Sequence, residues 1–172
     1  MEKYIEFKKS LIEEMVSKGA YEFQVLRALA CESWDELKVV IADNIEWIYN
    51  NKVNIPNDHY KSNLVEFTIV NRLLHGQLKA WYSNGQLKVQ EHYKNGLRHG
   101  ESKCFYENGQ LWVHSHFVNG LLDGECKWVY ENGQLWVHSH YENWLLHGEY
   151  KEYCRDGKLR EHSHYKNGKK IV

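Results

Sequence analysis

The stretch YENGQLWVHSHF, residues 106–117, decides the fold because it returns almost unchanged as YENGQLWVHSHY at residues 130–141. Residues 82–93, YSNGQLKVQEHY, and residues 154–165, CRDGKLREHSHY, are the same phrase with substitutions. Successive copies are 24 residues apart. Self-similarity at a fixed period of this size is typical of a chain built from stacked supersecondary units. A repeat array is therefore predicted.

Each copy is predicted to be a β-hairpin. In the third copy, residues 124–130 and 134–141 have the composition of strands, and Asn132-Gly133 stands between them. Asn-Gly is the strongest short hairpin signal, for a two-residue turn in which both residues have positive φ. A second glycine series, represented by Gly148, is expected where the backbone bends toward the next copy.

A two-residue turn would determine the face of the sheet on which each side chain lies. On the predicted apolar face the cross-strand pairs are Tyr130 with Leu135, Trp128 with Val137, and Cys126 with Ser139. On the opposite, polar face they are Val129 with Trp136, Lys127 with His138, and Glu125 with His140. A three-residue turn would shift every partner by one residue. The first register is preferred because it separates Leu, Val and Tyr from Lys, Glu and His.

The fold class predicted is α+β, with a small N-terminal helical cap followed by an elongated, single-layer antiparallel array of β-hairpins. Residues 1–50 are expected to form the cap, residues 51–63 a connection, and residues 64–172 four repeat copies with partial ends. Residues 51–61, which include Pro56, could instead form a ragged edge strand. Within the cap, helices are predicted at residues 3–17, at 21–31, and from a capping box at Ser33 to about Asn50. The cap either covers the first repeat, which a solenoid end requires, or is a separate recognition domain.

Composition argues against several function classes. The net charge is −1 at pH 7, so no bulk positive field would attract nucleic acid, which is not an expected partner. No apolar run approaches the roughly 18 residues that would indicate a membrane span. Four cysteines show no CxxC pairing, and no secretory leader precedes them, which predicts a reducing, cytoplasmic location.

Catalysis is not expected. A nucleophile needs a base within reach and a group that orients the base. Ser115 and Ser139 lie between histidines in the sequence, but the two-residue period of a strand turns them to the opposite face. The glycines belong to turns rather than to a phosphate-binding loop. No catalytic residue and no cofactor is predicted.

Paired histidines are the feature that most resembles a metal site. The two histidines of each pair share a face, about 6.8 Å apart along the strand. Each is expected opposite Lys or Glu, and neighbouring return strands lie about 9.6 Å apart, so no third ligand is near. A solvated ladder of His, Glu and Lys that responds to pH between about 5 and 7 is favoured over metal binding.

Trp112 and Trp136, with Phe105, are predicted to form an aromatic stripe on the polar face, beside the histidines. Exposed aromatic residues at regular spacing indicate a protein contact patch, and the alternative is that they only steady the sheet as cross-strand pairs. The candidate contact residues are Trp112, Trp136, Phe105, His114, His116, His138 and His140.

The last copy is predicted to leave an open sheet edge, because residues 165–172 begin a fifth copy and stop. An open edge invites pairing with another chain, moderated here by Lys169 and Lys170. A homo-oligomer is expected, joined near Tyr165, Ile171 and Val172 or through the apolar face.

The phrase YxNGQLxxxxHYxNGLLHGExK resembles the MORN repeat family, and most closely its variant class, over residues 66–172. The departures are Trp144 at a Gly position, Asp123 at a His position and Cys154 at a Tyr position. The resemblance implies a sheet of stacked hairpins used for protein contacts, self-association and, in some members, membrane apposition. Variant-class repeats are abundant in large DNA viruses of amoebae and in bacterial proteins labelled as antitoxins, so the location could be a host-cell cytoplasm or a virion.

The function predicted is a non-catalytic, self-associating scaffold that binds a protein partner. One alternative is a regulatory, antitoxin-like inhibitor that masks a partner protein. Another is a peripheral, membrane-apposed protein, although the sequence itself gives no sign of membrane binding.

Overall fold

The computed structural model describes residues 2–18, 20, 31, 34–44, 48, 55, 58–71 and 73–171. The chain divides into two compact units, Met1–Leu73 and Leu74–Val172. The predicted helix over residues 21–31 lies almost wholly outside the described residues, as do the capping serine Ser33 and the terminal Val172.

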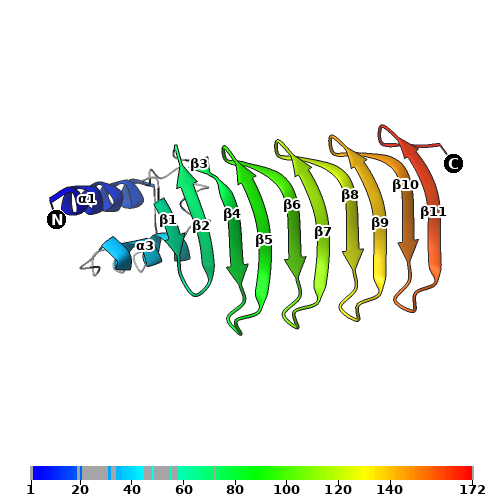
Figure 1. Ribbon diagram of the computed structural model, residues 1–172, viewed down its shortest axis with the longest axis horizontal. Helices are drawn as coiled ribbons and strands as arrows, with labels where there is room; N and C mark the ends of the chain where they lie inside the picture. Colours follow the sequence, from blue (N-terminus) through cyan, green and yellow to red (C-terminus); the bar gives the residue numbers. More distant parts are fainter. Residues whose placement is uncertain are drawn as a thin grey trace. The chain divides into compact units, whose positions relative to one another are not determined.

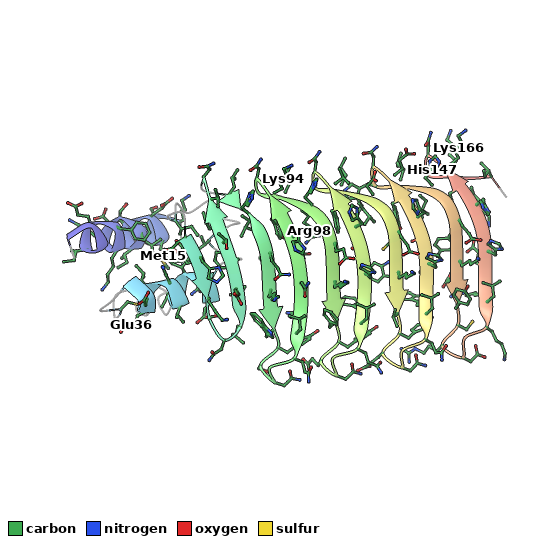
Figure 2. The ribbon with its side chains drawn as sticks, viewed as in Figure 1. Met15, Glu36, Lys94, Arg98, His147 and Lys166 are labelled. Atoms are coloured by element: carbon green, nitrogen blue, oxygen red, sulfur yellow. The ribbon has the colours of Figure 1, made fainter. Side chains whose placement is uncertain are left out.

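The described part of the first unit combines two helices with a short hairpin. The helices are α1 (Glu2–Ser17) and α3 (Trp34–Asp43), and the strands are β1 (Asp58–Lys61) and β2 (Val65–Val70), which pair antiparallel. Leu11 and Met15 are buried on α1 (Figure 2), and the rings of Tyr60 and Phe67 stack 5.1 Å apart. The predicted first helix is confirmed. Neither described helix is long and apolar enough to cross a membrane.

The second unit is a row of hairpins whose strands pair with their sequence neighbours in an open antiparallel sheet (Figure 1). Strand β3 (Leu73–Leu74) lies at the boundary between the units. The strands of the row are β4 (Gly76–Trp81), β5 (Leu87–Lys94), β6 (Leu97–Phe105), β7 (Leu111–Val118), β8 (Leu121–Val129), β9 (Leu135–Glu142), β10 (Leu145–Tyr153), β11 (Leu159–Lys166) and β12 (Lys169–Lys170). The predicted hairpin array is confirmed.

The turn at Asn132-Gly133 has three residues, so the predicted two-residue turn is wrong. The N–H of Gly133 donates to the carbonyl of Tyr130, and the N–H of Tyr130 donates to the carbonyl of Gln134, both at 2.8 Å. Of the three loop residues, all of them described, only Gly133 has a positive φ, at 83°. This is a type I turn closed by a glycine in the left-handed region.

Asn132 is required in that turn for its side chain rather than for its φ. Its Oδ1 accepts from the N–H of Gln134 at 3.1 Å, and its Nδ2 donates to the carbonyl of Arg155 in the next copy at 3.0 Å. The same pair of bonds recurs at Asn84 and Asn108. One asparagine thus closes its own loop and fastens that loop to the next.

A β-bulge next to each of these loops restores the predicted pairing in the body of the hairpin. Val129 pairs with Leu135, whereas Trp128 pairs with Val137, so Trp136 is an extra residue between two cross-strand pairs. The longer turn shifts the register by one residue, and the bulge shifts it back. The predicted pairs Trp128–Val137, Lys127–His138, Cys126–Ser139 and Glu125–His140 are confirmed. The predicted pairs Tyr130–Leu135 and Val129–Trp136 are wrong.

The two-residue Asn-Gly turns occur at the other end of the strands. Asn95 and Gly96 both have positive φ, and the flanking residues Lys94 and Leu97 pair directly. Between β9 and β10 Trp144 occupies the glycine position with φ 68°, and its N–H still donates to the carbonyl of Leu122 at 2.8 Å. The departure at Trp144 therefore leaves the hairpin intact. Figure 2 shows Lys94, His147 and Lys166 along the side of the sheet where the strands are joined by these turns.

Candidate functional site: the two faces of the repeat sheet

One face of the repeat sheet, the histidine face, carries a ladder of charged side chains. Lys127 and His138 both reach Glu125, with nitrogen to oxygen distances of 2.8 and 2.7 Å. The same triplet recurs in the copies before and after, as Lys103–Glu101–His114 and Lys151–Glu149–His162. The three histidine pairs of the face are His114 with His116, His138 with His140, and His162 with His164, and His92 occupies the position of His116 in the first copy. The structure matches the predicted His/Glu/Lys ladder.

The lysines hold the carboxylates of this ladder in their charged form. A hydrogen bond from Lys127 lowers the pKa of Glu125, and Lys103 and Lys151 lower the pKa of Glu101 and Glu149 in the same way. A carboxylate whose pKa is lower in the folded state stabilises that state above the ordinary glutamate value of 4.5. The contribution is lost as the pH falls through the lowered pKa. It is small because these groups face solvent.

The histidine pairs are engaged by this ladder. The rings of His162 and His164 lie 5.8 Å apart, and His162 contacts Glu149. The backbone carbonyl of Asp123 lies 3.0 Å from Nδ1 of His116. Within the described part of the chain, no group of three or more His, Cys, Asp or Glu side chains has the geometry to hold a metal ion.

Trp112 and Trp136 lie on the opposite face from the histidines, so their predicted placement on the polar face is wrong. Trp136 is the extra residue of the bulge, and a bulge re-aims its side chain. The ring of Trp136 lies 6.1 Å from that of Trp128, which belongs to the other face. We call this other face the serine face, after its buried serines Ser102, Ser115, Ser139 and Ser163.

Phe105 does not join the two tryptophans. It pairs with Leu111, across the bulge made by Trp112, and lies two residues from Lys103 on the histidine face. Leu111 and Leu135 therefore occupy the positions on that face where the tryptophans were predicted. The predicted stripe of Phe105, Trp112 and Trp136 is not formed.

Five aromatic side chains of the serine face form one continuous cluster. The ring of Trp128 packs edge-on against Trp112 at 5.9 Å and against Trp136 at 6.1 Å, with interplanar angles of 77° and 75°. Tyr106 and Tyr130 flank this trio, Tyr130 stacking on Trp136 at 5.4 Å. We call these five residues the aromatic cluster. Trp128, Tyr106 and Tyr130 were not among the predicted contact residues.

Hydrogen bonds between copies hold the aromatic cluster in place. The hydroxyl of Tyr106 donates to the carbonyl of Val129 at 2.9 Å, and that of Tyr130 donates to the carbonyl of Tyr153 at 3.0 Å. Trp112 nevertheless remains 39 % exposed. An aromatic surface that is already ordered loses little conformational entropy when another molecule binds to it.

Comparison with known families identifies this architecture. The model of the MORN repeat variant matches the chain four times in tandem, at residues 74–95, 98–119, 122–143 and 146–167, together just over half of its length. The chain belongs to the MORN repeat variant family. The resemblance inferred from the sequence is confirmed.

Comparison with curated proteins and with one solved structure adds no function to this MORN assignment. The comparison with curated proteins gave no match. One solved structure, described as "Crystal structure of GtfA/B complex bound to UDP and GlcNAc", aligns at 14 % identity with a TM-score of 0.22. The alignment covers 64 % of this chain but only 25 % of that one, so the chain spans about a quarter of its length.

The first MORN copy carries a buried ionic cluster where later copies have serine. Glu91 is buried on the serine face, at the position of Ser115 and Ser139. Its carboxylate accepts from the hydroxyl of Tyr93 at 2.7 Å and lies 3.1 Å from Nε of Arg98 (Figure 2). Burial raises the pKa of Tyr93 to about 12. Because its charge is paired within the sheet, Glu91 has a structural role.

Of the predicted edge residues, Tyr165 lies in the last MORN copy, and Ile171 and Val172 follow it. Tyr165 pairs with Gly148 and Lys170, and its ring contacts Tyr150 at 5.8 Å. Ile171 is 60 % exposed, and its N–H donates to the carbonyl of His164. Tyr165 is thus held within the sheet, whereas Ile171 presents its side chain to solvent. Val172 lies outside the described residues.

Proposed function

We propose that this MORN protein is a non-catalytic protein-interaction scaffold that binds its partner through the aromatic cluster. One observation carries the proposal: the bulges bring Trp112 and Trp136 together with Trp128 on a partly exposed face. Aromatic residues that are rigid and partly exposed dominate the energetics of many protein interfaces. Arrangement of the hairpins in a single layer would leave this face open to a partner.

Substitution of both Trp112 and Trp136 by alanine is expected to reduce partner binding by at least about tenfold, because central aromatic residues each contribute about 2 kcal/mol or more. The measurement is cross-linking and co-purification of the tagged full chain from its native host, with quantitative mass spectrometry. The matched control is His114→Ala with His138→Ala, which alters the opposite face. Binding that survives the tryptophan substitutions but is lost in the histidine control would contradict the proposal.

The outer edge of β11 supports self-association as a second proposed activity. Strand β12 pairs with Tyr165 and Lys166 of β11, the N–H of Ile171 bonds to His164, and among the described strands none pairs with the rest of that edge. Backbone N–H and C=O groups on such an edge can pair with a second copy.

A dimeric mass is therefore expected in light scattering at micromolar concentration. Replacement of Ile171 by lysine, which adds charge to the edge, is expected to shift the mass toward the monomer. A monomeric mass for the unaltered chain at that concentration would rule out self-association, whether or not the aromatic cluster binds a partner.

Two alternatives remain distinguishable by experiment. A captured enzyme that loses activity when this chain binds would support the antitoxin-like, inhibitory alternative. Sedimentation of the chain with anionic liposomes would support the membrane-apposed alternative.

A further inference from the structure

The bulged position recurs in all four copies and falls on every second strand of the sheet. The extra residue is Lys88 in β5, Trp112 in β7, Trp136 in β9 and Arg160 in β11. These strands alternate with the others along the row (Figure 1). We call the four residues the bulge row. It presents two tryptophans in the middle and one cation at each end.

The spacing of the bulge row selects one type of extended ligand. Neighbouring members are two strands apart, which is about 9.6 Å. A polyproline II helix advances about 9.3 Å in each turn of three residues, so every third side chain repeats along one edge at nearly this interval. A β-strand of similar rise would place residues three apart on opposite faces. An α-helix would need about six residues for the same distance, which does not return to one face.

The two central residues offer what a polyproline II segment needs. Proline rings pack well on flat aromatic surfaces, and the unpaired backbone carbonyls of such a segment accept hydrogen bonds. No described residue accepts a hydrogen bond from the indole N–H of Trp112 or Trp136, so both donors are available to a ligand.

The two end residues favour acidic flanks on the ligand. Lys88 is exposed, with its ammonium group 5.6 Å from the ring of Tyr82. Arg160 donates from one guanidinium nitrogen to Glu152 at 2.9 Å, and its side chain is 66 % exposed, so its remaining donors face solvent. The neighbouring carboxylate of Glu161 is paired with Lys170. Each end of the bulge row can therefore take a carboxylate.

We propose, as a deepening of the proposed function and resting on it, that the bulge row binds a polyproline II segment of a partner protein. Two prolines three residues apart lie on Trp112 and Trp136. An acidic residue three positions before the first proline pairs with one end cation, and another three positions after the second pairs with the other. Because the row carries a cation at both ends, the segment binds in either chain direction.

The test is titration of the full chain with a synthetic peptide, read by tryptophan fluorescence and confirmed by calorimetry. The in-phase peptide has prolines three residues apart and a glutamate three residues beyond each. The control peptide has the same composition but prolines four residues apart. We expect the in-phase peptide to bind at least tenfold more tightly. Equal binding of the two peptides, or no binding of the in-phase peptide at millimolar concentration, would overturn the proposal.

Charge reversal provides a test that does not depend on removing tryptophan. Lys88→Glu with Arg160→Glu, both at exposed positions, is expected to weaken the glutamate-flanked peptide at least tenfold and to favour the same peptide with lysine flanks. Tighter binding of a single-stranded oligonucleotide than of the peptide would also overturn the proposal. If native-partner capture requires Trp112 and Trp136 while neither peptide binds, the interaction surface stands and the polyproline II ligand is wrong.

Discussion

Replacing Phe117 by alanine is expected to lower the free energy of unfolding by about 3 kcal/mol, as truncation of a buried phenylalanine usually does. Phe117 is 5 % exposed and packs edge-on against Trp144 at 5.9 Å, with the guanidinium of Arg98 5.2 Å from its ring. Alanine would lose these contacts in a sheet whose side chains can collapse only partly into the gap. Urea denaturation followed by circular dichroism measures the change.

The matched control is Tyr165→Ala, the same repeat position in the last copy. Tyr165 is less buried, and the described strand beyond it, β12, has only two residues, so its truncation is expected to cost less than half as much. Equal losses at the two positions would show that stability does not depend on packing between successive copies.

Replacing Gly124 by valine is expected to destabilise the chain by about 2 kcal/mol, the cost of a strained backbone conformation. Gly124 has φ +108°, which a β-branched residue cannot adopt without strain. A Cβ atom there would lie 3.5 Å from Cβ of His116, an ordinary van der Waals contact, so the cost comes from the backbone. The midpoint of thermal unfolding, read beside the urea midpoint, measures the loss.

Gly133→Ala is the comparison for this substitution. Gly133 has φ 83°, and the only atoms near its added Cβ belong to the flexible amide of Gln110, at 3.8 Å. An alanine there is expected to cost about 1 kcal/mol, the ordinary penalty of the left-handed region. If valine at 124 cost no more than alanine at 133, the distortion at Gly124 would not be a structural requirement.

The pairing in the hairpin body was predictable from the sequence because charged and apolar residues alternate along each strand, and this alternation assigns each side chain to a face. The 24-residue period, the Glu125–His140 pair and the Lys127–His138 pair all follow from sorting charged from apolar residues. The turn was not predictable from its Asn-Gly dipeptide. The repeat contains two Asn-Gly series, and Asn132 is selected by two side-chain hydrogen bonds rather than by a positive φ.

Of the candidate site, the histidine face was predictable from the sequence, and the placement of the two tryptophans was not. The histidine face lies in the hairpin body. There the predicted pairing is correct although the predicted turn is one residue too short, because the bulge shifts the register back. Trp112 and Trp136 are themselves the bulged residues, so the wrong turn length placed these two side chains on the wrong face. A signal was present in the sequence, since the position that holds Trp twice holds Lys88 and Arg160 elsewhere. Such variation is unusual for a residue that packs in a regular strand.

The identity of the side chain at the bulge is independent of the strand pairing within each hairpin. A residue outside the regular ladder can change from lysine to tryptophan to arginine without altering any cross-strand partner, as the four copies show. Point mutations can therefore change the side chains of the bulge row, and duplication of one copy can lengthen it. The partner that is recognised can therefore diverge while the fold stays the same.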